Sequence, residues 1–269
     1  MIDIGVNLLH KQFAADREEV IRRAHAAGVT TMLITATDLE STTNAIAFSE
    51  THDMFCTAGV HPHDAAGAVE SFTSDLASLA QSDRVKAIGE TGLDFNRNYS
   101  APEIQRKVFA SQLELACELH KPVFVHDRDS NGEVFQHLQS AGGDLCGVVV
   151  HCFTGSRADL ERYIEAGYYI GITGWVCDRR RGEELRSLVC EIPLNKLLVE
   201  TDAPFLLPQT APADWHAQQT VQANSRRNEP ALLPYVIAQI AELHQSDPTT
   251  VAEATARNAR TLFDLPEPL

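Results

Sequence analysis

The stretch Gly-Val-Val-Val-His-Cys-Phe-Thr-Gly, residues 147–155, decides how this chain can fold. Three consecutive valines lead directly to His151, and a turn closed by Gly155 follows. An unbroken apolar run suits a strand that is buried on both faces, as in a parallel sheet. An imidazole at the carboxyl end of such a strand lies where (β/α)₈ barrels place their chemistry, so His151 is a candidate site residue.

Three other apolar runs also end in a side chain that can bind a metal ion. Residues 85–89 precede Glu90, residues 122–125 precede His126, and residues 197–199 precede Glu200-Thr201-Asp202. The carboxyl ends of the strands of a parallel barrel meet at one face. The four runs therefore predict one shared site at that face.

Segments of two kinds alternate along the chain. Apolar or β-branched segments predict strands over residues 2–6, 30–36, 54–60, 168–172 and 196–200, and strands that end at 90, 126 and 151. Helical periodicity predicts helices over residues 16–27, 39–50, 69–81, 130–140, 156–166, 182–190 and 249–262, and one that ends near 244. Eight strands alternating with helices predict an α/β fold, a (β/α)₈ TIM barrel, formed as a single domain by residues 1–269.

A further helix is predicted to begin near residue 100. Ser100 is followed three residues later by Glu103, and Pro102 lies between them. A serine with a glutamate at this spacing is typical of a capping box, and proline is favoured in the first helical turn. The pattern therefore predicts Ser100 as the N-cap of this helix.

Composition limits the classes of function. The net charge is −15, with 22 basic and 37 acidic residues, which excludes a protein that coats duplex DNA through a basic stripe. The six cysteines form no C-x-x-C pair, as expected of reduced thiols in a cytosolic protein. The sequence contains neither a secretory signal nor an apolar run long enough to cross a bilayer. We therefore expect a cytoplasmic protein with no membrane partner.

Glu90, His126, His151 and Asp202 are the candidate metal ligands. Imidazoles and carboxylates together suit a catalytic divalent ion. Oxygen ligands favour Mg²⁺ or Mn²⁺, whereas paired histidines also accept Zn²⁺. One histidine at a strand end is more often a core or capping residue. Four unmatched polar groups buried at one barrel end would cost several kcal/mol, so a shared ion is the better interpretation.

The chain resembles the TatD deoxyribonuclease family of metal-dependent hydrolase barrels. The stretches that carry the resemblance are residues 58–63 (Ala-Gly-Val-His-Pro-His), 88–94 (Ile-Gly-Glu-Thr-Gly-Leu-Asp), 150–155 (Val-His-Cys-Phe-Thr-Gly) and 198–204 (Leu-Val-Glu-Thr-Asp-Ala-Pro). The resemblance implies a 3′–5′ exonuclease that hydrolyses single-stranded DNA or RNA with Mg²⁺ or a similar ion. It further implies a cytoplasmic protein with a role in DNA repair, and we expect a monomer.

The first strand departs from the wider family. Most members carry His-x-His after this strand, where this chain has Gly5 and Asn7. The family pattern then implies one firm metal position, with Glu90, His126 and His151 as ligands. It leaves a second position with Asp202, Glu90 and, in place of an imidazole, Asn7, so the number of ions stays open.

The remaining candidates concern the substrate. Asp202 is predicted to orient a water molecule or to accept its proton, with His63 as a second catalytic residue. His61, His63, Arg128 and Arg227 are predicted to bind the phosphate; Asp94 is predicted to orient a metal ligand.

Each substrate candidate also has a structural explanation. His61 and His63 can belong to a rigid turn around Pro62. Arg128 can pair with Asp127 or Asp129, and the arginines near residues 179–181 and 226–227 can form a solvated face. Trp175 and Phe205 are weaker candidates for stacking on a base, because aromatic residues more often pack.

Two other functions are compatible with the same barrel. One is a small-molecule amidohydrolase or lactonase. Such enzymes usually carry the strand-one His-x-His and often a carbamylated lysine at strand four, where this chain has Glu90. The other is a non-catalytic partner protein, which the missing histidines at positions 5 and 7 favour.

Overall fold

A computed structural model of the chain describes residues 1–68, 70–215 and 226–267. The described residues fall into two compact units, one made of residues 1–33, 171–215 and 226–259 and the other of residues 34–68, 70–170 and 260–267. That residues 1–269 form a single domain stays a prediction. Among the described residues, no helix combines the length and the apolar character that a membrane span requires.

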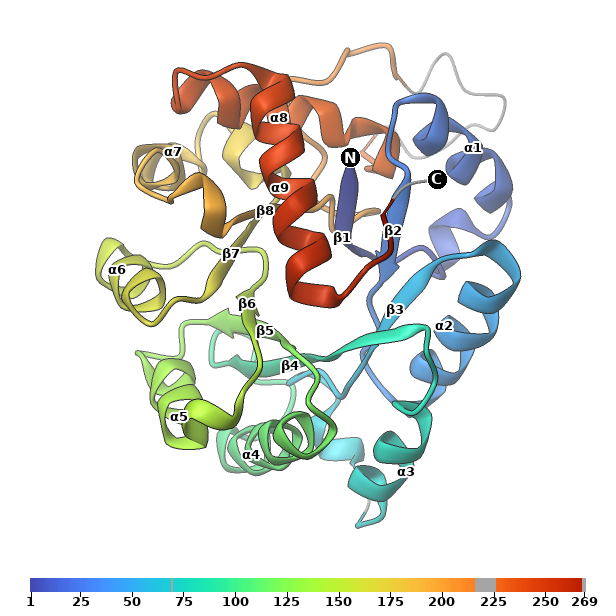
Figure 1. The fold of residues 1–269 in the computed structure, drawn as a ribbon, viewed down its shortest axis with the longest axis vertical. Helices are drawn as coiled ribbons and strands as arrows, with labels where there is room; N and C mark the ends of the chain where they lie inside the picture. The colour runs from blue at the N-terminus through green and yellow to red at the C-terminus, as the bar shows by residue number, and fades with distance from the viewer. Residues whose placement is uncertain (69, 216–225, 268–269) are drawn as a thin grey trace. The chain divides into compact units, whose positions relative to one another are not determined.

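The first unit contains both ends of the strand series (Figure 1). Its elements are β1 (Ile2–Val6), α1 (Arg17–Ala26), β2 (Thr31–Ile34), α7 (Glu183–Val189), β8 (Leu197–Val199), α8 (Leu233–Leu243) and α9 (Pro248–Phe263). β2 runs one residue past the boundary of the unit, to Ile34, and α9 runs past it to Phe263. Within this unit β1 contacts β8.

The second unit holds the middle of the series. Its elements are α2 (Leu39–His52), β3 (Phe55–Ala58), α3 (Phe72–Leu79), β4 (Val85–Asp94), α4 (Pro102–Leu119), β5 (Val123–Arg128), α5 (Glu133–Ala141), β6 (Val148–Val150), α6 (Arg157–Glu165) and the first half of β7 (Tyr169–Ile172). β3 to β7 pair in parallel, each with the next. Figure 1 shows α4 beside α5, and α4 packs on β4.

The strands follow one another in the sheet in sequence order, from β1 to β8, and a helix follows each strand. This is the strand order of a (β/α)₈ barrel, so the predicted fold class is confirmed. The valines of β6 are buried, as the quoted stretch predicts for a strand covered on both faces.

β4 contains the irregularity on which the site depends. Ile88 pairs with Val123 and Thr91 with Val125, so β4 advances three residues while β5 advances two. The extra residue forms a bulge, a feature that bends a strand and redirects a side chain. Gly89 and Glu90 lie in this bulge.

β4 is longer than predicted, since it continues past Glu90 to Asp94. Gly92 makes this possible, with φ of +147° and a position where a Cβ atom would lie 1.9 Å from the carbonyl oxygen of His126. Only glycine combines that φ with so close an approach. β4 therefore stays paired with β5 beside His126.

Ser100 does not cap α4, so that prediction was wrong. The N-cap residue is Ala101, which makes no side-chain cap hydrogen bond. The Ser100 hydroxyl instead donates to the carbonyl of His63 at 2.9 Å and accepts from the Ala66 amide at 2.9 Å. Ser100 therefore ties the loop after β3 to the start of α4.

Arg227 is placed differently from the substrate-binding role predicted for it. Its side chain is only 2% exposed, and its guanidinium donates to both carboxylate oxygens of Asp16 at 2.7 Å and to Glu229 at 2.6 Å. Arg23 donates to the same two acids. Both terminal nitrogens of Arg227 thus face buried carboxylates, and its substrate-binding role stays a prediction.

We expect Arg227→Met to destabilise the protein by about 3–5 kcal/mol, because it strips a buried partner from Asp16 and Glu229. Urea unfolding measures this loss. The exposed pair of Arg22 and Glu19 on α1 supplies the control, since Arg22→Met should leave stability nearly unchanged. Loss of substrate affinity at unchanged stability would instead support the predicted substrate-binding role of Arg227.

The buried carboxyl of Asp3 should make stability depend on pH. Burial raises its pKa from 3.8 to about 7, although hydrogen bonds from Thr201 oppose the shift. Between these two values the folded protein retains a proton that the unfolded chain releases, so the free energy of unfolding falls as pH rises. Urea unfolding of wild type and Asp3→Asn should therefore show wild type losing stability relative to the variant across this window. The same pH dependence in wild type and variant would show that burial does not raise the pKa of Asp3.

Candidate metal centre

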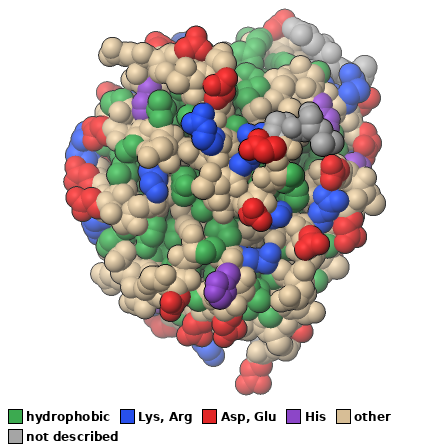
Figure 2. Space-filling view, in the orientation of Figure 1, with side chains coloured by type: hydrophobic (Ala, Val, Ile, Leu, Met, Phe, Trp, Pro, Cys, Tyr) green, Lys and Arg blue, Asp and Glu red, His purple; other side chains and the backbone are tan. Residues whose placement is uncertain are grey.

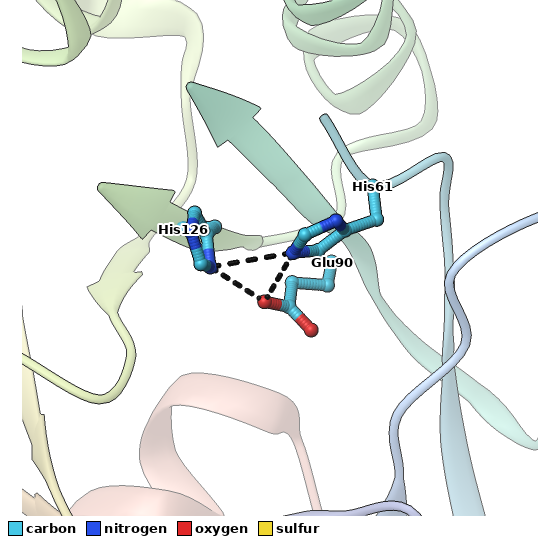
Figure 3. Close-up of side chains that lie close together, drawn as sticks. All are labelled: His61, Glu90 and His126. Atoms are coloured by element: carbon cyan, nitrogen blue, oxygen red, sulfur yellow. Dashed lines mark hydrogen bonds and ion pairs between the residues drawn. The ribbon is translucent and has the colours of Figure 1, made fainter. Parts of the chain in front are cut away.

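Four successive strands of the second unit bring polar side chains together. His61 follows β3, Glu90 lies in the bulge of β4, His126 lies in β5 and His151 directly follows β6. Figure 3 shows the first three pointing toward one another. The predicted convergence of strand ends therefore holds within this unit.

One carboxylate oxygen is the centre of the cluster. Glu90 Oε1 lies 2.7 Å from His151 Nε2, 2.9 Å from His126 Nδ1 and 3.2 Å from His61 Nε2. Three imidazole nitrogens therefore surround one oxygen in a buried site.

The donor set fits a divalent ion. His61, Glu90 and His126 each offer one ligand atom, and these atoms lie within 4.8 Å of one another. His151 presents a further nitrogen to the same oxygen. Imidazole nitrogens and a carboxylate are ligands that several divalent ions accept.

Burial and neighbouring charge set the ionisation of the cluster. Burial by itself would raise the pKa of Glu90, but His151, His61 and His126 outweigh it and hold that pKa well below 4.5. Burial lowers the pKa of His61 to about 4 despite the nearby Glu90. At neutral pH Glu90 is therefore a carboxylate and His61 a neutral imidazole.

Asp94 forms a second layer behind His126. Its Oδ2 lies 3.4 Å from His126 Nε2 and 2.7 Å from His63 Nε2, and its Oδ1 accepts the amide of Arg97 at 2.8 Å. Burial would raise the pKa of Asp94, but these hydrogen bonds outweigh it and lower that pKa. Asp94 thus lies where the sequence analysis expects a residue that orients a ligand.

His63 lies in this second layer and not against Glu90. Its ring contacts the rings of His61 and Tyr99 edge-on, at centroid distances of 4.3 and 4.7 Å. Tyr99, which is 65% exposed beside this cluster, is not among the residues predicted from the sequence. A single tyrosine in the loop after β4 carries no sequence signal that separates it from other exposed residues.

Arg128 lies at the end of β5, two residues after His126. Within the described chain, neither acidic neighbour pairs with it, since Asp127 accepts from Tyr163 and Asp129 accepts from Asn96. The ion pairs considered as alternatives for Arg128 are thus not formed.

Asp202 belongs to the first unit. Asn7 donates its side-chain amide to Asp202 Oδ1 at 2.8 Å, and the Asp202 amide donates to the carbonyl of Gly5 at 2.9 Å. Asp202 has φ of +51°, a conformation that non-glycine residues adopt at a cost and often at functional sites. That Asp202 shares an ion with the histidines stays a prediction.

The arginine and aromatic candidates of the first unit have local partners. Arg181 pairs with Asp178, and its guanidinium lies 4.4 Å from the ring centroid of Trp175. Phe205 is exposed and contacts His10 edge-on. These contacts favour the structural explanation for Arg181 and Trp175.

Comparison with known proteins extends the resemblance over the whole chain. The family model described as TatD related DNase matches residues 2–264. The chain is 46% identical over 266 residues to the "3'-5' ssDNA/RNA exonuclease TatD" of Salmonella typhimurium, covering 98% of this chain and 99% of the relative. It is 48% identical over 267 residues to the protein so named in Erwinia amylovora, covering 98% and 100%.

Solved structures agree with this assignment. A TatD homologue from Escherichia coli, YjjV, superposes with a TM-score of 0.86 at 29% identity, covering 99% of this chain and 98% of that one. A TatD family hydrolase from Entamoeba histolytica gives a TM-score of 0.87 at 25% identity, covering 98% and 97%. On sequence and fold together, this chain belongs to the TatD related DNase family.

Proposed function

We propose that this protein is a 3′–5′ exonuclease that hydrolyses phosphodiester bonds of single-stranded DNA and RNA. The observation that carries the proposal is the full-length identity of 46–48% to relatives of that name. The buried Glu90 carboxylate among three imidazoles supports it, because the cluster provides the ligand types that a metal-dependent hydrolase needs.

We propose Mg²⁺ as the ion used by the protein, with Mn²⁺ or Zn²⁺ as substitutes. The proposed ligands are Glu90, His126, His151 and Asp202. Carboxylate oxygens suit Mg²⁺, and imidazole nitrogens also admit the other two. When bound, such an ion supplies the Lewis acidity for phosphodiester hydrolysis.

Hydrogen bonding distinguishes His61 from the other histidines. The backbone amide of His63 donates to His61 Nδ1 at 3.0 Å. A neutral imidazole has one lone pair in the ring plane, so His61 must then carry its proton on Nε2. We therefore propose that His61 donates to Glu90 and does not ligate the ion.

His63 and Arg128 are proposed to contact the scissile phosphate, and Asp202 is proposed to orient the attacking water or accept its proton. His63 supports this role because Asp94 accepts from one end of its ring while its side chain stays 28% exposed. Asp202 supports its own role because the side-chain amide of Asn7 donates to its carboxylate and orients it.

The substrate is proposed to be held by local contacts near the site. On the face that Figure 2 shows, acidic and basic side chains of the described residues are mixed, without a continuous basic stripe. This agrees with the net charge of −15. We further propose a cytoplasmic monomer with a role in DNA repair.

We expect the purified protein to release mononucleotides from the 3′ end of a single-stranded oligonucleotide in the presence of Mg²⁺. A 5′-labelled substrate should shorten stepwise, and EDTA should stop the reaction until Mg²⁺ is added back. A double-stranded oligonucleotide of the same sequence is the control. Hydrolysis of small amides or lactones without nuclease activity would favour the amidohydrolase alternative.

Glu90→Gln and His126→Ala should each lower exonuclease activity by about 100-fold or more. Loss of even an outer partner of a metal ligand typically costs roughly 10–100-fold, and these two residues are proposed ligands themselves. Initial rates with labelled oligonucleotide measure the effect. His25 is exposed on α1, so His25→Ala is the matched control and should leave the activity unchanged. Unchanged activity in Glu90→Gln and His126→Ala would refute the ligand assignment.

A further inference from the structure

Gln112 of α4 pairs with the backbone of a single residue next to the metal centre. The amide of Val60 donates to Gln112 Oε1 at 2.8 Å, and Gln112 Nε2 donates to the carbonyl of Val60 at 3.0 Å. Gln112 Nε2 also donates to Thr91 Oγ1 at 2.7 Å. Val60 directly precedes His61, and Thr91 directly follows Glu90, so this one carboxamide contacts the neighbours of two site residues.

Gln105 of the same helix repeats the arrangement at Asp94. The amide of Asp94 donates to Gln105 Oε1 at 2.8 Å, and Gln105 Nε2 donates to the carbonyl of Asp94 at 3.1 Å. Gln105 Nε2 also donates to the carbonyl of Ser100 at 2.8 Å, and Ser100 in turn holds the carbonyl of His63. The second carboxamide thus holds the residue that accepts from His63 and faces His126.

Both glutamines act where strand pairing between β3 and β4 has ended. The last paired residues are Ala58 of β3 and Ile88 of β4. Val60 and Asp94 lie beyond this pair, so their buried peptide groups need other partners. A carboxamide presents one donor and one acceptor, as a peptide group does, and therefore takes the place of the missing strand.

Both glutamines occupy helix positions where an apolar residue is expected. Gln105 and Gln112 are seven residues apart, and Val108 and Phe109 lie between them on the same buried face. This spacing normally selects apolar residues. Burying a glutamine also costs more side-chain conformational entropy than burying leucine or isoleucine. Hydrogen bonds to the backbone offset that cost at these two positions.

We infer that Gln105 and Gln112 are positioning residues, which hold the backbone from which His61, Glu90 and Asp94 project. Neither is a ligand, since their polar atoms are occupied by peptide groups and Thr91. The inference rests on the metal centre proposed above. It predicts that both residues matter for metal affinity and not only for stability.

Mn²⁺ binding to the full-length protein tests the inference. Gln112→Met keeps the length of the side chain but removes its donor and acceptor. We expect the Mn²⁺ dissociation constant, measured by titration calorimetry, to rise about tenfold, the lower end of the range for outer partners of metal ligands. Gln105→Met should have the same effect through Asp94, and serves as the test if Gln112→Met does not fold.

Leu113→Ala supplies the control for lost stability. Leu113 is buried on the same helix and has no part in the site, so the variant should unfold more easily yet bind Mn²⁺ like the wild type. Weaker binding in the glutamine variants alone supports positioning. Equal binding in all of the folded variants would show that the glutamines only stabilise the fold. If the wild type itself binds no Mn²⁺, the proposed metal centre fails, and this inference fails with it.

Discussion

The structure of the site depends on a carboxylate buried in a bulge of β4. An ionised carboxylate removed from water needs partners, since its desolvation costs several kcal/mol. Glu90 obtains them from three imidazole nitrogens, all within 3.2 Å of one oxygen. Imidazole suits this position because it can donate a proton to the carboxylate or offer a lone pair to an ion. The same residues can therefore satisfy Glu90 both with and without a metal.

The residues that contact Glu90 need partners of their own, which lie in successive layers around it. His126 turns one nitrogen toward Glu90 and the other toward Asp94. Asp94 is held in turn by backbone amides and by the carboxamide of Gln105. Each layer fixes the orientation of the one inside it, which is how a site keeps its geometry when its innermost side chains carry several rotatable bonds.

The sequence predicts the inner layer better than the outer ones. An apolar run followed by a polar residue indicates both a buried strand and a side chain at its end, and Glu90, His126 and His151 do meet as this pattern predicts. The bulge at Glu90 has no comparable signature, and the continuation of β4 to Asp94 depends on contact between Gly92 and His126.

Some residues have partners that are close in space but distant in the sequence. Arg227 follows another arginine and looks like part of a basic cluster, yet it is buried against Asp16, more than two hundred residues earlier in the chain. Ser100 and Glu103 match a local capping pattern, but the serine hydroxyl binds the loop that carries His63. A local sequence pattern cannot predict which of two possible hydrogen bonds such a side chain forms, because that depends on where the tertiary fold places an acceptor.

Asn7 gives the Asp202 carboxylate a partner at a position where most of the wider family carries a histidine. An imidazole at that position would offer a lone pair to an ion, whereas the amide donates a hydrogen bond to Asp202 Oδ1. The carboxylate therefore keeps a directional partner in a strand end that no longer supplies a histidine. The hydrogen bond from Asn7 therefore orients the Asp202 carboxylate. The absence of histidines at positions 5 and 7 is thus compatible with the role proposed for Asp202.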